Sequence, residues 1–344
     1  PKQLGEVLFE KLMLPSGKKT KTGWSTNAEV LEELADDYPI VKDILEYRTL
    51  AKLKSTYCEG LLKVIGKDGR IRSTLNQTET RTGRISSTEP NLQNIPVRSE
   101  LGSRMRKFFV ADEGNVLVDA DYSQIELRVL AHLSGDRTMI KGFIDGEDIH
   151  RITASQVFDM PMNMVTPLMR SRAKAVNFGI VYGISPFGLS EQLNIPRKEA
   201  ATLIEEYFVQ YPNIKKYIDD NIDFARKYGY AQTLLGRRRY LPDINSRNNA
   251  MKSFAERNSV NMPIQGTSAD MIKIAMNEIY KELDGKGLKS RMILQVHDEL
   301  VLDVYKPELE EVKAIVADKM INALALDLPI EVGIDIGDNW LEAH

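Results

Sequence analysis

Cysteine and long apolar runs are the two features that this sequence most clearly lacks. Cys58 is the single cysteine among 344 residues, so no disulfide can form within the chain, and the four histidines do not combine with it at zinc-ligand spacing. No apolar run reaches the ~18 residues that a membrane-spanning helix needs. These absences exclude a disulfide-stapled scaffold and a zinc-ribbon module. They predict a protein of a reducing compartment without a membrane partner.

Glycine-rich phosphate loops are also missing. Neither GxGxxG nor GxxxxGK[ST] occurs in the chain, and these are the loops whose backbone N–H groups cradle phosphates in dinucleotide-binding and P-loop proteins. Any nucleotide ligand would therefore be held by side chains rather than by a backbone cradle.

An excess of positive charge is absent from the chain as a whole but present in two segments. The formal net charge is −3, which by itself argues against a nucleic-acid binder. Residues 48–107, however, hold thirteen Lys/Arg against five Asp/Glu, and residues 226–257 hold eight against two. Such runs are usually solvated faces. Because these also contain Gln, Asn and Tyr, a polyanionic partner is as well supported as a plain surface.

What the chain does contain is a regular succession of helical and strand-like segments, with 42% hydrophobic residues to build cores. Two opening helices are expected, one entered through a capping box at 26–29 and one at Pro39. Further elements are expected as strands flanking an Asp-Gly turn at 67–70, a strand at 115–123, helices at 124–135, across 149–230 and at 264–283, a hairpin at 292–304, a helix at 307–324 and a strand at 329–337. Strands from distant segments with a helical block between them indicate an α+β fold.

The stretch "VLVDADYSQIE" (116–126) carries the first candidate catalytic carboxylates. Alternation along a strand puts Asp119 and Asp121 on one face, with Asp121 at the carboxyl end, where a carboxylate is well placed to hold a metal. Two structural readings compete with this one. Asp121 could instead cap the next helix, and Ser123 with Glu126 has the spacing of a capping box.

The stretch "LMRSRAKAVNFGIVYG" (168–183) contains cations without acidic partners. Arg170, Lys174, Phe178 and Tyr182 recur every four residues, so a helix entered at Pro167 would carry them on one broad face. Two cations followed by two aromatic rings suit a triphosphate at one end and a base or sugar at the other. On spacing alone, an amphipathic packing helix explains the pattern somewhat better.

The stretch "QVHDELV" (295–301) places three ionisable residues at the tip of an apolar hairpin. A solvated turn would explain them. Alternatively, Asp298 lies beside Asp121 on one sheet, and the pair could hold two Mg²⁺ ions about 4 Å apart, as in phosphoryl transfer.

In these three segments the sequence resembles the family A DNA polymerases, the group of bacterial DNA polymerase I. "DYSQIELR" and "VHDEL" are similar to the two palm motifs of the family, and "RSRAKAVNFGIVYG" is similar to its fingers helix. "TRTGRISSTEPNLQNIP" (80–96) and "NMPIQGTSAD" (261–270) resemble two further segments that touch the primer–template. The resemblance covers nearly the whole chain.

This resemblance implies a role for each matching residue. The metal ligands would be Asp121, Asp298 and the backbone carbonyl of Tyr122, holding two Mg²⁺ ions for which Mn²⁺ can substitute. The nucleotide contacts would be Arg170, Lys174, Phe178, Tyr182, His150, Glu126 and Gln124, with Lys174 also a candidate acid for the leaving group and Glu126 the gate against a ribose 2′-OH. The DNA contacts would be Arg84, Asn91, Gln93, Asn94, Asn261, Gln265, Arg257, Lys52, Lys54 and His297. Glu299 would support the catalytic Asp298 rather than bind metal directly.

The resemblance also implies an architecture and a reaction. We expect the right-hand polymerase fold with an antiparallel palm sheet, mostly helical fingers and a partial helical thumb, divided as thumb 1–57, palm 58–133, fingers 134–257 and palm 258–344. The reaction would be template-directed addition of dNTPs to a primer 3′-OH, without proofreading in this chain. Primer–template DNA, dNTPs and the amino-terminal thumb and exonuclease portion of a longer parent polymerase are the expected partners. A cytoplasmic, nucleoid-associated bacterial location is expected, and an organellar origin stays open.

Three other functions can be weighed against these motifs. A single-subunit RNA polymerase shares the palm, although Glu126 and "NLQNIP" favour DNA synthesis. A non-catalytic module that grips primer–template DNA would be expected to lack a catalytic carboxylate, and neither Asp121 nor Asp298 is missing. A weakly active fragment, in which an incomplete thumb holds duplex DNA poorly, would keep both carboxylates and differ in processivity.

Overall fold

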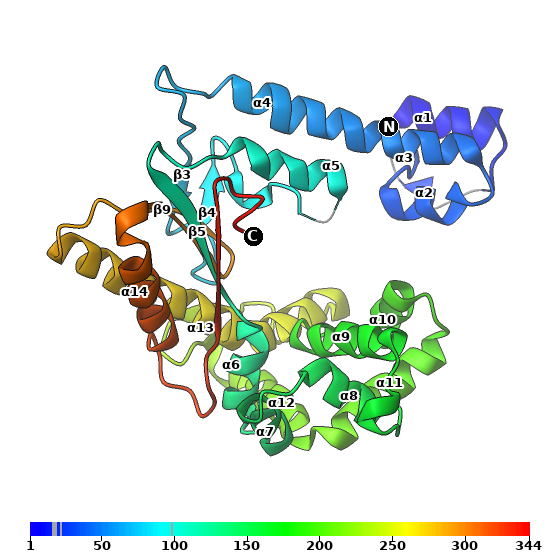
Figure 1. Cartoon of the computed structure of the whole chain (residues 1–344). Coiled ribbons are helices and arrows are strands. Elements are labelled where there is room, and N and C mark those ends of the chain that lie inside the picture. Colours follow the sequence, from blue (N-terminus) through cyan, green and yellow to red (C-terminus); the bar gives the residue numbers. More distant parts are fainter. Residues whose placement is uncertain (16–18, 21–22, 98) are drawn as a thin grey trace. The chain divides into compact units, whose positions relative to one another are not determined.

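The computed structural model describes residues 1–15, 19–20, 23–97 and 99–344. The chain forms two compact units, Pro1–Thr74 and Leu75–His344, and each is described by itself (Figure 1). In the described residues no helix has the length and apolar character needed to cross a membrane.

The first unit is mostly helical. Its elements are α1 (Lys2–Glu6), the π-helical η1 (Val7–Lys11), β1 (Lys19–Thr20), β2 (Gly23–Trp24), α2 (Ala28–Ala35), α3 (Pro39–Lys52), the π-helical η2 (Leu53–Cys58) and α4 (Glu59–Leu62). Pro39 is the first residue of α3, as predicted. Leu8, Leu31 and Val41 are fully buried between these helices, so the unit has its own small core.

Two local predictions in the first unit were wrong. The cap of α2 is Asn27, whose side chain accepts a hydrogen bond from the Val30 N–H at 3.3 Å, whereas the Thr26 hydroxyl accepts one from Arg48 at 3.0 Å. The predicted strand before the Asp-Gly turn is helical up to Leu62 and then forms a turn, and a single bridge, Ile65 with Ile71, flanks the Asp-Gly turn. The helical run entered at Pro39 therefore extends through α3, η2 and α4 to Leu62 and takes in the start of the apolar run that looked like a strand.

A four-stranded antiparallel sheet lies at the centre of the second unit. Its order is β10 (Val332–Gly337), β5 (Asn115–Tyr122), β9 (Glu299–Tyr305) and β8 (Arg291–Val296). Six of the eight residues of β5 are buried, as expected for a central strand covered on both faces. The predicted antiparallel sheet from distant segments is thereby confirmed.

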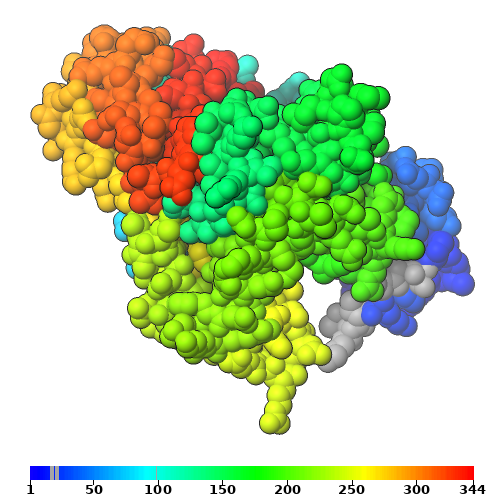
Figure 2. Space-filling view, turned by 90° about the horizontal axis from the view of Figure 1, so that it is seen from below, coloured from blue at the N-terminus to red at the C-terminus, as the bar shows by residue number. Residues whose placement is uncertain are grey.

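Helices and short elements complete the second unit. They are β3 (Thr74–Asn76), β4 (Ser86–Thr88), η3 (Leu92–Asn94), α5 (Glu100–Ser103), η4 (Arg104–Phe108), α6 (Ile125–Ser134), α7 (Arg137–Ile144), α8 (Ile149–Val157), η5 (Met162–Met164), α9 (Pro167–Val181), α10 (Pro186–Leu193), α11 (Arg197–Gln210), α12 (Pro212–Tyr228), β6 (Tyr230–Gln232), β7 (Arg238–Tyr240), α13 (Asn249–Gly285), η6 (Lys306–Glu308) and α14 (Leu309–Ile321). Figure 2 shows orange-red atoms of the segment that follows α14 lying directly against green atoms of the helices, and the Asp327 N–H donates to the His132 ring of α6 at 3.2 Å. One core joins the sheet to these helices.

The long helix α13 differs from its prediction. It has 37 residues and begins after Asn248, whose side chain accepts hydrogen bonds from the Ala250 and Met251 N–H groups. The sequence placed its start at 264, because Pro263 ordinarily ends or opens a helix. Met262 and Ile264 on either side of that proline are fully buried. Packing in the core therefore keeps α13 continuous across Pro263.

Two neighbouring tyrosines in this core differ in one respect. Tyr207 and Tyr211 are both fully buried, with ring centroids 4.8 Å apart. The Tyr211 hydroxyl lies 3.0 Å from the Thr153 hydroxyl, whereas the Tyr207 hydroxyl has no hydrogen-bond partner among the described residues. Burial without a partner is unfavourable for a hydroxyl group.

The two tyrosines therefore predict opposite mutational effects. Tyr211→Phe should lower the free energy of unfolding by about 1 kcal/mol, because it leaves Thr153 short of a buried hydrogen bond, whereas Tyr207→Phe should be neutral or stabilising. Urea unfolding of both variants measures this difference. Equal destabilisation by the two substitutions would contradict it.

Candidate active site

Two carboxylates from distant segments meet at one end of the central strands. Asp121 is the penultimate residue of β5, and Asp298 lies in the two-residue turn that joins β8 to β9. The Tyr122 N–H donates to the Asp298 carbonyl at 3.2 Å, which fixes the turn against β5. His297, the other turn residue, is exposed and has a left-handed φ of 53°. The predicted pairing of the two strand-end carboxylates is thus present.

Burial makes both carboxylates harder to ionise, Asp298 adds to this effect at Asp121, and Arg84 and His297 oppose it at Asp298. Burial, followed by the nearby Asp298 and Asp119 carboxylates, raises the pKa of Asp121 to about 7. Burial also raises the pKa of Asp298. Like charges held together without a counter-ion favour protonation, and a bound cation reverses that preference. The pair is therefore electrostatically prepared to bind a cation.

Glu126 links the end of β5 to the end of α9 and does not cap α6. The residue before α6 is Gln124, which has a left-handed φ of 52° and makes no side-chain cap, so the predicted capping box of Ser123 and Glu126 was wrong. One oxygen of the buried Glu126 pairs with Arg84, and the other accepts a hydrogen bond from the Tyr182 hydroxyl at 2.8 Å. Glu126 thus joins the β5–α6 turn to the end of α9.

The predicted cations and rings lie on α9, which begins at Pro167 with Thr166 as its cap. Arg170 and Lys174 are exposed on this helix. Arg170 donates to Asp148 at 2.5 Å, so one of the two cations does have an acidic partner, from outside the segment. The Lys174 ammonium lies 6.0 Å from the Phe178 ring centroid. The helix therefore presents cations at its start and aromatic rings toward its end.

His150 packs beside this helix as a neutral imidazole. Its ring centroid is 5.6 Å from that of Phe178, and its Nδ1 lies 3.0 Å from the side-chain Nδ2 of Asn177. Burial, Arg170 and Lys174 lower the pKa of His150 to about 4, although Asp148 opposes them. With Asn177 donating to Nδ1, the remaining ring proton lies on Nε2, which can donate to an anion.

A pocket of about 500 Å³ lies at the carboxyl end of α9. Phe178, Tyr182 and Arg257 line it together with Gly183. Gly183 has a left-handed φ of 67°, and a Cβ there would approach the Arg257 side chain to 2.8 Å. The pocket brings together three residues that the sequence assigned to nucleotide or DNA binding.

The other predicted DNA contacts differ in their surroundings. The Asn91 side chain accepts from the Gln93 N–H at 3.0 Å, and Gln93 donates to the Ile85 and Gln295 carbonyls at 3.1 Å each, so both support local structure. The remaining positions are the exposed Asn94, the half-buried Asn261 and Gln265 on α13, and, in the first unit, the exposed Lys52 and Lys54. Buried side-chain oxygens of Asn261 and Gln124 have no hydrogen-bond partner among the described residues.

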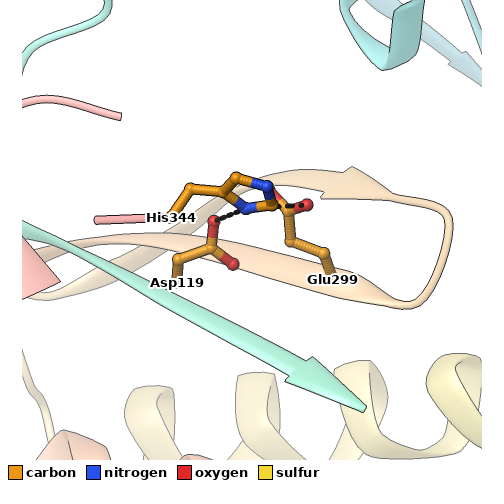
Figure 3. A group of neighbouring side chains, drawn as sticks. All are labelled: Asp119, Glu299 and His344. Carbon is orange, nitrogen blue, oxygen red and sulfur yellow. Dashed lines mark ion pairs between the residues drawn. The ribbon is translucent and has the colours of Figure 1, made fainter. Parts of the chain in front are cut away.

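A second acidic group lies beside the first and was not predicted as a site. Asp119, Glu299 and His344 each place a potential ligand atom within 4.8 Å of the others (Figure 3). The His344 Nδ1 lies 3.5 Å from Asp119 and 3.7 Å from Glu299. Asp119 and Glu299 are buried. This group could hold a metal, and no sequence pattern pointed to the contribution of His344.

Comparisons with known proteins agree with this geometry. A family model described as DNA polymerase family A matches residues 1–342. DNA polymerase I of Caldicellulosiruptor bescii is 53% identical over 343 residues, covering 99% of this chain and 40% of that protein. DNA polymerase I of Bacillus subtilis is 52% identical over 345 residues, covering 100% and 39%. The chain thus spans about two fifths of the length of these curated relatives.

A solved structure gives the same assignment. The POL domain of Pol1 from M. smegmatis, in complex with DNA primer-template and dNTP, superposes with a TM-score of 0.95 at 47% identity, covering 99% of this chain and 60% of that chain. The fold is therefore that of a polymerase domain, with mixed helices and antiparallel sheet. The chain belongs to DNA polymerase family A, which confirms the resemblance inferred from its motifs.

Neutralising one strand-end carboxylate should stabilise the metal-free protein at pH 8. The pKa of Asp121 is raised from 3.8 to about 7, so the folded state loses stability as pH rises between those values, and Asp121→Asn removes that loss. Although surrounding atoms partly bury the carboxyl group of Asp121, its side chain reaches solvent, and screening limits the gain to about 1 kcal/mol.

The measurement is the melting temperature in EDTA at pH 8 and at pH 5, where the gain should shrink. Asp159→Asn, at an exposed turn after α8, is the matched control and should change nothing. An equal gain in both variants, or none in Asp121→Asn, would count against the predicted repulsion.

Proposed function

We propose that this chain catalyses template-directed DNA synthesis, adding dNTPs to a primer 3′-OH with release of pyrophosphate. The observation that carries this proposal is the pairing of Asp121 with Asp298 at adjacent strand ends. The solved relative with primer-template and dNTP supports the same substrates for this chain. The assignment of thumb, palm and fingers to the ranges predicted from the sequence is part of the proposal, as are the bacterial, nucleoid-associated location and the amino-terminal partner portion.

The donor set at the strand ends fits two Mg²⁺ ions, with Mn²⁺ as a substitute. Asp121, Asp298 and the Tyr122 carbonyl supply the oxygen ligands that such hard cations prefer. The raised pKa of Asp121 also indicates an uncompensated negative charge that a cation would balance. Asp121, Asp298 and the Tyr122 carbonyl would hold the ions, whose chemistry would be to lower the pKa of the primer hydroxyl and to stabilise the charge of the departing pyrophosphate. In this proposal the two carboxylates stay rigid because their strands pair directly.

The cations of α9 would bind the triphosphate. Arg170 and Lys174 would neutralise phosphate charge, and Lys174, one turn further along α9, would protonate the leaving group. Asp148 already holds Arg170, so its guanidinium is partly oriented before nucleotide binds. The neutral His150 would donate from Nε2 to a phosphate oxygen without adding charge.

Discrimination for deoxyribose would depend on the Glu126 junction. Arg84 and Tyr182 both hold the Glu126 carboxylate, which leaves little freedom for the side chain to move away from a ribose 2′-OH. Phe178 would pack against the incoming sugar and base. Its lack of a hydroxyl predicts poor use of dideoxynucleotides.

DNA binding would combine sequence-independent contacts. Arg84, Asn261 and Gln265 would reach minor-groove acceptors, which every correct base pair presents, so pairing is checked without reading sequence. Arg257, Asn91, Gln93, Asn94 and His297 would lie along the template and primer, and Gln124 near the nucleotide. Lys52 and Lys54 would contact phosphates, so affinity should fall steeply with salt.

The central test is extension of a labelled primer on a defined template with Mg²⁺ and four dNTPs. Asp298→Ala should reduce the rate by at least about 1000-fold, because removing a metal ligand removes several kcal/mol of transition-state stabilisation. Glu206→Ala, an exposed acidic position on α11, should extend normally. Undiminished extension by Asp298→Ala would refute the mechanism. Salt-sensitive binding without extension by the wild type would identify a DNA-binding fragment.

The gating role gives a separate prediction. Glu126→Ala should raise the relative kcat/KM for ribonucleotides at least about tenfold, since the carboxylate that meets the 2′-OH is gone. The measurement is single-nucleotide incorporation with dNTP and rNTP in turn. Tyr182→Phe, which frees one Glu126 oxygen, should have a smaller effect in the same direction. Unchanged selectivity in both variants would show that Glu126 does not act as the gate.

A further inference from the structure

Trp340 joins the two strands that carry the proposed metal ligands. Its indole Nε1–H lies 3.3 Å from an Asp119 oxygen and 3.0 Å from a Glu299 oxygen, so one donor serves both carboxylates. Asp119 belongs to β5, two residues before Asp121, and Glu299 begins β9 directly after Asp298. The indole therefore spans the two strands next to their catalytic ends.

Strand register explains why these side chains meet. Asp121 is paired with Glu299 across β5 and β9, and Asp119 is paired with Val301. Asp119, Asp121 and Glu299 consequently share one face of the sheet, with Asp119 and Glu299 as diagonal neighbours. If Asp119 or Glu299 moved, the nearby metal ligand on the same chain segment, Asp121 or Asp298, would move with it.

The Trp340 ring is itself rigidly held. It is 1% exposed and packs edge-on against Phe109, with ring centroids 5.6 Å apart. The Arg106 guanidinium lies 4.1 Å from the ring centroid, and its Nη1 is 3.6 Å from Glu299. The backbone N–H of Trp340 donates to the Phe109 carbonyl at 2.9 Å. The indole position is thus fixed by backbone, ring and cation contacts together.

The Trp340 indole and the His344 ring both lie between the two buried carboxylates, and the indole N–H is the closer of the two to each of them. One Asp119 oxygen has no hydrogen-bond partner among the described residues. Buried like charges that lose a shared donor separate or take up a proton.

We propose that Trp340 is a positioning residue of the polymerase site: its indole N–H holds Asp119 and Glu299 together, and this keeps Asp121 and Asp298 at the separation that binding of the two metal ions requires. The inference rests on the proposed polymerase function. It assigns a role in metal binding to a side chain that itself touches neither metal nor substrate.

The test replaces Trp340 with Phe, which keeps an aromatic ring and removes the N–H. Two quantities are measured: the Kd for Mn²⁺, by electron paramagnetic resonance on a complex with dideoxy-terminated primer–template and dNTP, and the Mg²⁺ concentration for half-maximal extension. Both should rise about tenfold, as for loss of a hydrogen bond behind a metal ligand. The KM for dNTP at saturating Mg²⁺ should stay within about twofold.

Trp24→Phe is the matched control. The chain has two tryptophans, and the Trp24 Nε1–H also donates to a carboxylate, Glu10, at 3.0 Å. This variant loses an equivalent hydrogen bond in the first unit. Its Mn²⁺ affinity should equal that of the wild type.

A second variant separates positioning from folding. Glu299→Gln removes the repulsion and can donate to Asp119, so Trp340→Phe should have less than about a threefold effect on the Mn²⁺ Kd in the Glu299→Gln background. A merely structural role would lower the melting temperature and the active fraction but leave this Kd unchanged, and that result overturns the proposal. An unchanged Kd in folded Trp340→Phe, or a tenfold effect persisting with Glu299→Gln, overturns it as well.

The proposed function fails independently of this inference. If the wild type binds Mn²⁺ and extends no primer, polymerase activity is refuted. If the wild type extends primers and Trp340→Phe matches it in both metal measurements, only the role of Trp340 is refuted.

Discussion

The gathering of carboxylates at one end of a buried sheet is the constraint on which the rest of the second unit depends. Asp121 lies in β5 and Asp298 in the turn directly before β9, and the other residues of both strands are almost entirely buried. Separating the like charges by local movement would therefore break the sheet. The apolar strands therefore supply the energy that keeps the carboxylates together. This repulsion is stored in the fold and becomes useful only when a cation is bound.

Three arginines of the second unit pair with carboxylates and differ in how deeply they are buried. Arg106 is buried next to Glu299, Arg84 pairs with Glu126, and Arg170 on α9 pairs with Asp148. The deepest pair is buried, where a guanidinium offsets charge strongly, whereas Arg170 is exposed and can exchange its partner for a phosphate at little cost. Burial thus separates cations that hold the fold together from cations that remain available to a ligand.

The periodic elements could be predicted from sequence, and the interactions between them could not. Alternation located β5, β9 and their strand-end carboxylates, and the four-residue spacing located the face of α9. The acidic partner of Arg170 was missed because Asp148 lies 22 residues earlier, outside any helical spacing. The Ser123–Glu126 spacing suggested a cap, but Glu126 found stronger partners in Arg84 and Tyr182. Local propensity was overridden wherever tertiary contacts offered a charged or buried partner.

The contribution of the carboxyl-terminal residues shows the limit of motif reasoning most clearly. Neither Trp340 nor His344 belongs to a motif, and each reaches the site only because β10 pairs with β5 and returns the chain to the same sheet face. Asp119 lies on the predicted face of β5, so the sequence does locate the carboxylate. The sequence does not locate the Trp340 indole N–H, the donor that stabilises this buried carboxylate. A motif therefore identifies the ligands of a charged site, whereas the topology of the sheet decides what holds them in place.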